Sequence, residues 1–191
     1  MELRKLEEKD AELMFEWMHD SSVVEHLQTD FESKTIEDCK AFIKDANNDN
    51  TTHLHMAIIN DQDEYMGTVS LKNITKNDAE FAITIRKVAM GQGYSRYAMK
   101  EIIRIGFEEL KLNRIYWCVN PNNKRAIRFY DKGGYMRTDI KNDKYILTGG
   151  VTRQNRFRNI FGTRYQKRQE ELSTTKYFQQ YLLACKYKGV C

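Results

Sequence analysis

Two stretches decide how this chain folds: Met90-Gly91-Gln92-Gly93-Tyr94-Ser95, and residues 123–135, which read Asn-Lys-Arg-Ala-Ile-Arg-Phe-Tyr-Asp-Lys-Gly-Gly-Tyr. The first stretch follows residues 79–86, where apolar and polar residues alternate as in a strand. It precedes a stripe of apolar residues at helical spacing that runs to about Leu110. A further apolar strand is predicted at 114–119. A strand, a glycine turn, a helix and a second strand form a crossover unit, so we expect the two strands to be parallel neighbours.

The other elements follow from local pattern. Thr35 followed by Asp38 predicts a capped helix over 36–46, and Asp10 is a plausible N-cap for a helix that starts beside it. Polar connectors of hairpin length indicate that the strands before Arg86 are antiparallel neighbours. The remaining expected elements are strands at 2–7, 53–60, 65–71, 135–140 and 144–147, and a helix at 123–132.

Composition predicts a single soluble domain. The chain has 191 residues, 41% of them hydrophobic and 30% charged, which fits a globular protein and argues against disorder. No apolar run approaches the roughly 20 residues of a membrane span, and the N-terminus is too charged for a signal peptide. The four cysteines have neither Cys-x-x-Cys spacing nor a histidine in register, so we expect reduced thiols, no metal site and a cytoplasmic protein.

The charge is distributed unevenly along the chain. The formal net charge is +4, yet residues 141–191 carry eleven Lys and Arg against three Asp and Glu. We therefore predict a domain over 1–148 and a basic C-terminal extension over 149–191, which could be helical. Such a tail can meet polyanions, but a solvated helix explains it more simply and nucleic acid is not the favoured partner.

Both stretches carry chemistry. Gly91 and Gly93 let the backbone approach a ligand closely, and the helix N-terminus behind them offers N–H groups to a phosphate. Neither a P-loop nor the dinucleotide fingerprint is present, because no Gly-Lys-Ser/Thr follows and Arg96 stands where a third glycine belongs. A plain tight turn remains the alternative. In the second stretch Asn123 is an N-cap candidate, and Tyr130, two turns later, can face the same side of the helix.

In this order and separation, the two stretches resemble the GCN5-related N-acetyltransferase (GNAT) superfamily. Its members open the long helix with Gln/Arg-x-x-Gly-x-Gly/Ala and later carry an Asn three residues before Ala or Ser, then a Tyr before Lys-x-Gly-Phe. This chain departs from the pattern at Met90 and Ser95, and the missing side chain at Met90 could weaken one pyrophosphate contact. The resemblance covers about residues 2–148. It implies an α/β (α+β) fold with a mixed, mostly antiparallel sheet of about six to seven strands, flanked by helices and splayed between the fourth and fifth strands.

The resemblance also implies acetyl-CoA as co-substrate, with no metal. The pantetheine arm would pair with the end of the fourth strand, and the pyrophosphate would lie on the glycine turn. The implied cofactor-binding residues are Ile83, Thr84, Ile85, Met90, Gly91, Gln92, Gly93, Tyr94, Ser95, Asn123, Ala126 and Tyr130.

For catalysis, the resemblance implies that Tyr130 donates a proton to the departing thiolate and that Glu80 accepts the proton of the amine. From spacing alone, Tyr130 could instead be a packed aromatic and Glu80 a surface carboxylate. His26, His53 and His55 are weaker candidates for the base.

The acceptor is the least defined part. The segment around Trp17 is similar to one found in two branches, which acetylate either nucleotide-linked amino sugars or protein N-termini and polyamines. Trp17 and Glu80 are the candidate substrate-binding residues, and Trp17 as ordinary core is the competing interpretation. We expect a small-molecule primary amine; a protein N-terminus and a non-catalytic acyl-CoA-binding module are the alternatives. A homodimer is left open.

Overall fold

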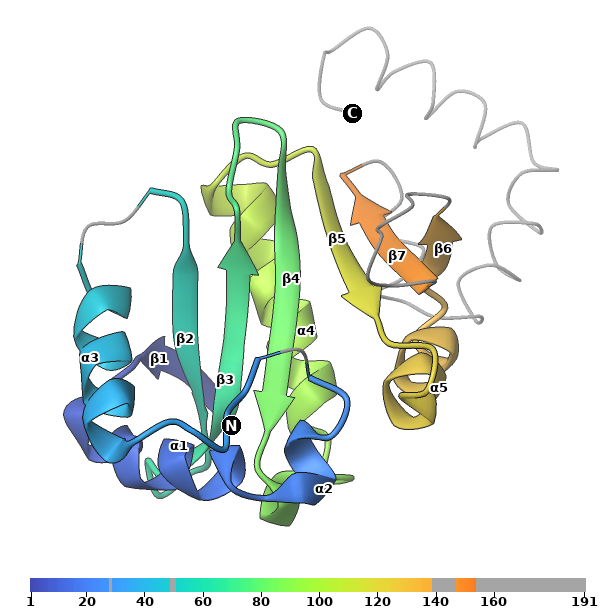
Figure 1. Cartoon of the computed structure of the whole chain (residues 1–191). Helices are drawn as coiled ribbons and strands as arrows, with labels where there is room; N and C mark the ends of the chain where they lie inside the picture. The colour runs from blue at the N-terminus through green and yellow to red at the C-terminus, as the bar shows by residue number, and fades with distance from the viewer. Residues whose placement is uncertain (28, 49–50, 139–146, 154–191) are drawn as a thin grey trace, which may run out of the picture.

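The computed structural model describes residues 1–27, 29–48, 51–138 and 147–153. Its centre is one seven-stranded sheet in the order β1-β2-β3-β4-β5-β7-β6 (Figure 1). Among the described strands, only β4 and β5 pair in parallel, and every other neighbouring pair is antiparallel. The strands are β1 Glu2–Lys5, β2 Leu54–Ile59, β3 Tyr65–Lys72, β4 Asp78–Ile85, β5 Arg114–Val119, β6 Met136–Thr138 and β7 Leu147–Thr152.

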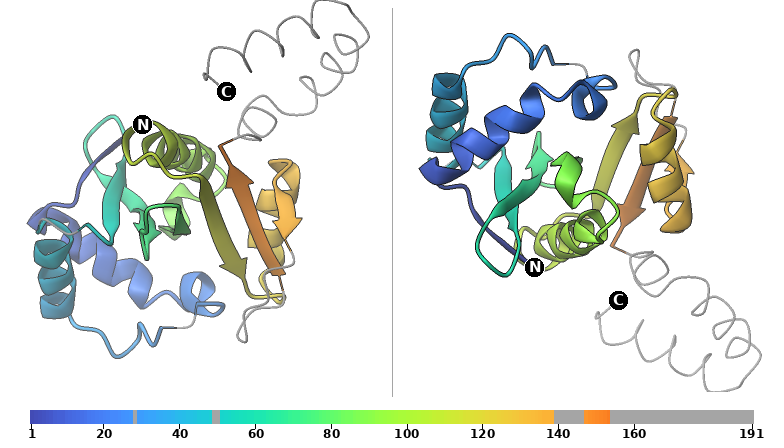
Figure 2. Two further views of the ribbon diagram at one scale, coloured as in Figure 1. Left: turned by 90° about the horizontal axis from the view of Figure 1, so that it is seen from above. Right: turned by 90° about the horizontal axis from the view of Figure 1, so that it is seen from below.

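Helices cover both faces of this sheet. Seen from above and below, α1, α2 and α3 lie on one side of the sheet and α4 on the other (Figure 2). The helices are α1 Ala11–Met18, α2 Ser21–Val24, α3 Ile36–Ala46, α4 Tyr94–Arg104 and α5 Lys124–Lys132, with short 3₁₀ turns at Glu8–Asp10 and Lys87–Ala89. No helix among the described residues is long and apolar enough to cross a membrane.

The sequence predictions of fold class, of the central strands and of the parallel crossover are confirmed. The Thr35–Asp38 capping box is present, because the Thr35 hydroxyl accepts from the Asp38 N–H at 3.2 Å and Asp38 Oδ2 accepts from the Thr35 N–H at 2.9 Å. Two helices differ from the prediction. The long helix ends at Arg104 and continues as one π-helical segment, Ile105–Glu109. The short helix α2 was not predicted, because four residues are too few to show a period.

Asp10 stands at the predicted N-cap position of α1, but its side chain plays a different part from a cap. Its side chain makes no cap to α1. Instead it is 1% exposed and accepts two hydrogen bonds from the Arg4 guanidinium, each 2.8 Å, and a third from the Glu7 N–H. The carboxylate thus ties β1 to the start of α1, a contact between two elements that helix-start statistics do not contain.

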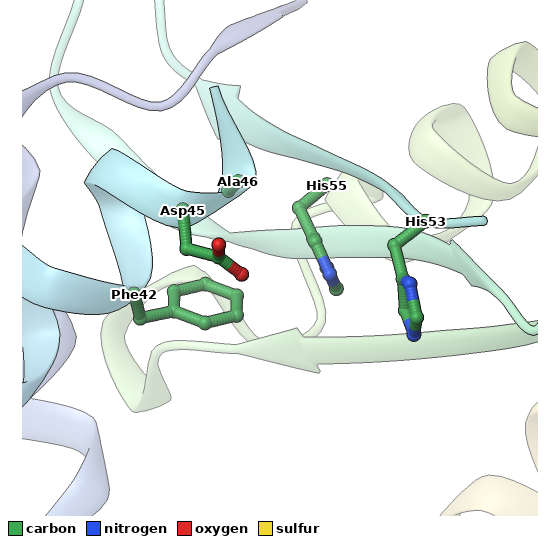
Figure 3. Close-up of a pocket in the computed structure, with 5 residues that line it drawn as sticks. All are labelled: Phe42, Asp45, Ala46, His53 and His55. Atoms are coloured by element: carbon green, nitrogen blue, oxygen red, sulfur yellow. The ribbon is translucent and has the colours of Figure 1, made fainter. Parts of the chain in front are cut away.

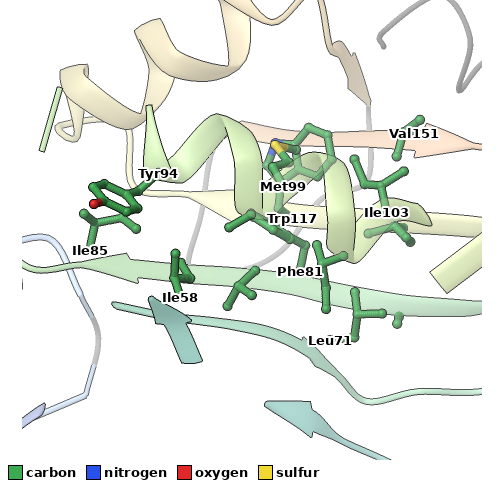
Figure 4. Packing of buried hydrophobic residues seen from close by; sticks show 14 of the residues in the cluster. Ile58, Leu71, Phe81, Ile85, Tyr94, Met99, Ile103, Trp117 and Val151 are labelled. Carbon is green, nitrogen blue, oxygen red and sulfur yellow. The ribbon is translucent and has the colours of Figure 1, made fainter. Parts of the chain in front are cut away.

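One core fills the space between α4 and the sheet. Leu71, Phe81, Met99, Ile103 and Trp117 are all at most 2% exposed and come from β3, β4, α4 and β5 (Figure 4). The alternation predicted for residues 79–86 is responsible, since it turns one side of β4 toward α4. A second core joins α1 and α3 to the opposite face of β2 and β3.

The last strand runs across the domain boundary that we predicted at residue 148. β7 continues to Thr152, with Val151 1% exposed and paired with Ile115 of β5. Arg153 then donates to the Leu112 and Phe107 carbonyl oxygens at 2.9–3.1 Å. The chain therefore belongs to the sheet up to this point. The expected strand residues 139–146, and the extension from 154 onward, lie outside the described residues.

Candidate active site

The strands β4 and β5 separate shortly after they meet. Their parallel pairing covers only Asp78↔Arg114, Ala79↔Ile115 and Glu80↔Tyr116, although β4 continues to Ile85 and β5 to Val119. In Figure 1 the two strands lie close at their starts and diverge toward their ends. This confirms the splayed pair that the family resemblance implied.

The divergence leaves one edge of β4 without a strand. On its other edge β4 pairs with β3 from Glu80 to Ile85, and the Arg86 N–H donates to the Met66 carbonyl at 2.9 Å. In an antiparallel pair every second residue turns its N–H and C=O toward the partner. Because Arg86 and Thr84 face β3, the N–H and C=O groups of Ile83 and Ile85 face the side of β5. They are the groups that an extended amide chain could pair with.

The glycine turn lies at the end of this open edge. Gly91 and Gly93 have φ values of +78° and +94°, which side chains rarely adopt, so both glycines are required by the backbone. A Cβ added at Gly91 would have nothing within 4 Å, and one at Gly93 would meet only the end of the Met1 side chain. The first bond of α4 runs from the Tyr97 N–H to the Gly93 carbonyl at 3.0 Å. The N–H groups of Tyr94, Ser95 and Arg96 precede this bond and have no partner in the helix.

The turn fits a diphosphate on this evidence: it is open, its glycines add no bulk, and several N–H donors converge at a helix N-terminus. The side chains of the turn contribute less. Gln92 Nε2 donates back to the Val88 carbonyl at 2.6 Å, and Tyr94 is only 8% exposed, in the core beneath. We therefore expect the backbone, rather than the side chains of Gln92 and Tyr94, to contact a ligand here.

Most of the second decisive stretch, residues 123–135, forms helix α5. Asn123 caps it: its side-chain oxygen accepts from the Ala126 N–H at 2.9 Å. The predicted N-cap is confirmed. The helix packs Ala126, Ile127, Phe129 and Tyr130 against the core of α4 and β5.

Tyr130 lies on Trp117 of β5. The two rings stack, with centroids 4.8 Å apart and planes 15° apart. Tyr130 keeps part of its surface exposed, yet burial raises the pKa of its phenol well above the usual value near 10. No hydrogen bond from its hydroxyl to another described residue is present. Tyr130 is thus both packed, as the simpler interpretation had it, and left with an unused donor.

Glu80 occupies the last paired position before β4 and β5 separate. Its side chain is 25% exposed and accepts from Asn73 Nδ2 at 3.2 Å, while Lys72 Nζ lies 3.9 Å from Oε1. The carboxylate therefore stands at the mouth of the opening, on the face of β4 opposite the α4 core, with a cation beside it.

Trp17 lies in the second core and not at the opening. It is 4% exposed, its indole N–H donates to the Tyr65 hydroxyl at 3.0 Å, and that hydroxyl bonds to Thr68 Oγ1 at 2.6 Å. Its ring also meets Phe31 edge-on at 5.1 Å. These contacts support the packing interpretation of Trp17, and substrate contact by this residue stays a prediction.

A separate pocket of about 250 Å³ lies between α3 and β2 (Figure 3). It is lined by Phe42, Asp45, Ala46, His53 and His55. His55 shares a hydrogen bond of 2.7 Å with Ser70 Oγ, and burial, with His53 and Lys72 nearby, lowers the pKa of its imidazole to about 4. His55 is therefore neutral near pH 7. In the part of the chain that is described, no group of three or more His, Cys, Asp and Glu could hold a metal ion.

Sequence reasoning missed Arg86 and Trp117. Arg86 is 5% exposed and joins Glu16 of α1 at 2.8 Å and Glu64 at 2.9 Å, so it fixes the end of β4 beside α1. Trp117 forms the platform under Tyr130, and a Cβ at Gly149 would collide with its ring. The sequence predicted an apolar strand at 114–119, but the pattern could not show which residues Trp117 contacts across the sheet.

Comparisons with known proteins agree with this geometry. A family model described as acetyltransferase (GNAT) domain matches residues 1–136. Acetyltransferase PseH of Campylobacter jejuni is 25% identical over 143 residues, 75% of this chain and 87% of that protein. YnaD of Bacillus subtilis, an uncharacterized N-acetyltransferase, is 29% identical over 136 residues, 71% of this chain and 78% of its own.

Solved structures share the fold. The crystal structure of spermidine N-acetyltransferase from Vibrio cholerae in complex with CoA and spermine has a TM-score of 0.67, with 20% identity over 80% of this chain and 95% of that one. At this identity the likeness speaks for the fold alone. The family model, in contrast, spans both decisive stretches and matches well over half of the residues. The open edge of β4, the glycine turn and α5 all lie within the matched residues, and the chain belongs to the GNAT acetyltransferase family.

Proposed function

We propose that this protein transfers an acetyl group from acetyl-CoA to the primary amine of a small molecule. The observation that carries the proposal is the early end of the β4–β5 pairing. Because of it, the N–H and C=O groups of Ile83 and Ile85, which face away from β3, have no partner strand and border an opening that ends near the glycine turn. The pantetheine arm is an extended amide chain, and its pyrophosphate needs N–H donors. The free backbone groups of Ile83 and Ile85 suit the amide chain, and the free N–H groups at the start of α4 suit the pyrophosphate.

Three groups of the chain would then act on the reaction. Acetyl-CoA supplies an acetyl thioester. The Ile85 N–H, directed away from β3, is positioned to donate to the thioester carbonyl oxygen as negative charge develops there. Glu80, at the mouth of the opening, accepts the proton that the attacking amine loses.

Tyr130 holds the proton for the departing thiolate. A model thiol has a pKa of about 8.5, and burial keeps the pKa of Tyr130 far above neutrality, so the phenol is protonated at every physiological pH. Proton transfer to a thiolate in water would be uphill. The same burial that disfavours the phenolate also disfavours a thiolate beside it. Burial therefore raises the pKa of the thiol as well, and the difference between the pKa values of the phenol and the thiol becomes smaller.

The acceptor is the finer part of the proposal. The presence of spermine in the Vibrio cholerae structure supports a small amine, and a nucleotide-linked amino sugar is the other small-molecule class that we consider. The alternatives are a protein N-terminus as acceptor and an acyl-CoA-binding module without activity. Glu80, at the last paired residue before the opening, and Tyr130, stacked on Trp117 of β5, favour catalysis over the module.

A turnover assay with an amine panel tests the proposal. Release of CoA from acetyl-CoA is followed with spermidine, a nucleotide-linked amino sugar and short peptides with free N-termini, and with the thioester alone as blank. We expect turnover above the blank with a small amine. Turnover only with peptides would transfer the function to protein N-termini, and CoA binding without turnover on any amine would favour the binding module.

A further inference from the structure

Arg125 reaches from α5 to the glycine turn. It is the second residue of α5, and its Nη1 lies 2.7 Å from Sδ of Met90, the residue immediately before Gly91. A thioether sulfur is a weak acceptor, whereas a guanidinium offers five N–H donors. The contact therefore places a strong donor group beside the turn and leaves most of its donors unused.

The charge of Arg125 is also uncompensated. The side chain is exposed, and no carboxylate in the described ranges lies within 4.0 Å of it. The four arginines Arg4, Arg86, Arg104 and Arg114 each have such a partner. An unpaired guanidinium next to free N–H groups and a helix N-terminus produces a site of concentrated positive potential.

Arg96 adds a second positive charge, three residues after Gly93. It belongs to the first turn of α4 and is exposed. It lies near enough to Tyr135 for its charge to oppose the rise that burial causes in the pKa of that phenol. Arg96 on α4 and Arg125 on α5 thus both add positive charge near the turn.

We propose that Arg125 binds the pyrophosphate of CoA, so that α5 and the start of α4 grip the diphosphate together. This inference rests on the proposed function, because it requires CoA in the opening. A guanidinium matches two phosphate oxygens at once, and such a charge-assisted pair is stronger than a neutral hydrogen bond. Met90 cannot supply a charge from within the turn. Arg125 supplies it from a different element, 35 residues further along the chain.

The test separates the phosphates of the ligand. The dissociation constants of CoA, dephospho-CoA and pantetheine are measured for the parent chain, Arg125→Gln and Arg125→Lys by calorimetry, with NMR titration for weak binding. Arg104→Gln is the matched control: it removes the same charge from the other end of α4, where Arg104 pairs with Glu101 and Glu109. Thermal melting confirms that each variant is folded.

We expect Arg125→Gln to weaken CoA and dephospho-CoA equally, by about 10- to 100-fold, and to leave pantetheine binding unchanged. Arg125→Lys should retain part of the affinity, and Arg104→Gln all of it. An effect on CoA alone would assign Arg125 to the 3′-phosphate and overturn the proposal, and so would unchanged binding of all three ligands or an equal loss that includes pantetheine. If the parent chain binds none of the three, the proposed function fails first, and this result is distinct from the others.

Discussion

The two edges of β4 differ in how far they pair with a neighbouring strand. Toward β3, the strand is paired over six residues, Glu80 to Ile85, and the pairing extends to Arg86. Toward β5, it is paired over three, Asp78 to Glu80, and then not at all. The same eight residues thus form a closed sheet on one side and an open edge on the other.

The surroundings of β5 account for this difference. β3 is held to β4 along its length, whereas β5 pairs over six residues with β7, from Arg114↔Thr152 to Val119↔Leu147. Trp117 of β5 also stacks on Tyr130 of α5. β5 therefore follows β7 and α5 away from β4. Unpaired backbone groups are costly when buried, so an opening of this kind is stable only if solvent or a ligand satisfies them. We infer that the open edge is the functional edge.

The largest expected effect is a loss of turnover when the hydroxyl of Tyr130 is removed. Tyr130→Phe removes the hydroxyl and keeps the ring that stacks on Trp117, so stability should hardly change. If the phenol serves the leaving thiolate, kcat should fall by about 10²- to 10⁴-fold, the usual contribution of a general acid. Steady-state kinetics at saturating amine, with a separate binding measurement for CoA, tests this. A group needed only as charge develops acts on kcat and leaves ground-state affinity alone.

A kcat within about twofold of the parent, far below that range, would remove Tyr130 from the catalytic groups. The packing contact with Trp117 would then be its whole role. The equivalent change at Tyr135, whose ring meets Trp117 edge-on at 5.2 Å, is the matched control. Tyr135→Phe removes a phenol from the same aromatic cluster and should leave kcat nearly unchanged.

The next largest effect concerns the glycine turn at the end of the open edge. Gly93→Asp would place a carboxylate beside the pyrophosphate, where like charges repel. We expect CoA affinity to fall by about 100-fold or more, since several kcal/mol of repulsion are available at close range in a partly desolvated site. The backbone strain of a side chain at φ +94° is expected as well.

Gly134→Asp separates charge from strain. Gly134 also has a positive φ, +70°, and open space around it, but it follows the C-terminal end of α5. Both variants should lose about 1–2 kcal/mol of stability from the left-handed backbone. Only Gly93→Asp should lose CoA binding. Equal affinities in the two variants would show that the phosphates lie elsewhere.

A third change addresses the closed edge. A Cβ at Gly67 of β3 would collide with the backbone carbonyl of Thr84, its neighbour on β4. Backbone cannot rotate away as a side chain can, so Gly67→Ala should cost about 1–3 kcal/mol, as overpacking does. Denaturant unfolding would measure it. A stability equal to the parent would mean that β3 and β4 separate easily, and the contrast between the two edges would then be weaker than the pairing indicates.

How much of this could be predicted depends on whether a feature is local. The capping box at Thr35, the alternation in β4 and the glycine turn are each encoded within a few residues, and the structure has them where the pattern indicated. The crossover rule then fixed the parallel pair. Asp10 shows the opposite case, because its partner Arg4 lies on the sheet and replaces the cap that its neighbours suggested.

The site divides in the same way. The positions of Glu80 and Tyr130 followed from motifs that resemble the family's. The contacts that give them their environment come from distant segments: Lys72 beside Glu80, Trp117 beneath Tyr130, and Arg125 against Met90. The predicted domain boundary at residue 148 assigns Gly149 to the extension. This glycine lies inside β7, where the ring of Trp117 leaves no room for a side chain.

The smallest expected effect is a pH dependence that arises away from the open edge, at His55 on β2. Its folded-state pKa is about 4, below the ordinary value of 6.5, because burial and nearby positive charges disfavour the imidazolium. Above pH 6.5 the imidazole is neutral in both the folded and the unfolded chain, and contributes nothing to the pH dependence. As the pH falls from about 6.5 to about 4, the unfolded chain binds a proton that the folded chain excludes, so the stability of the fold decreases.

His55→Gln removes this titration, and the difference in unfolding free energy between parent and variant should shift by about 1 kcal/mol between pH 7 and pH 5, once the partial exposure of the ring is allowed for. Because the comparison is with a variant, carboxylates that titrate at lower pH cancel. Parallel stability curves over this range would place the His55 ring in water, and the pocket beside it would then not exclude solvent from β2.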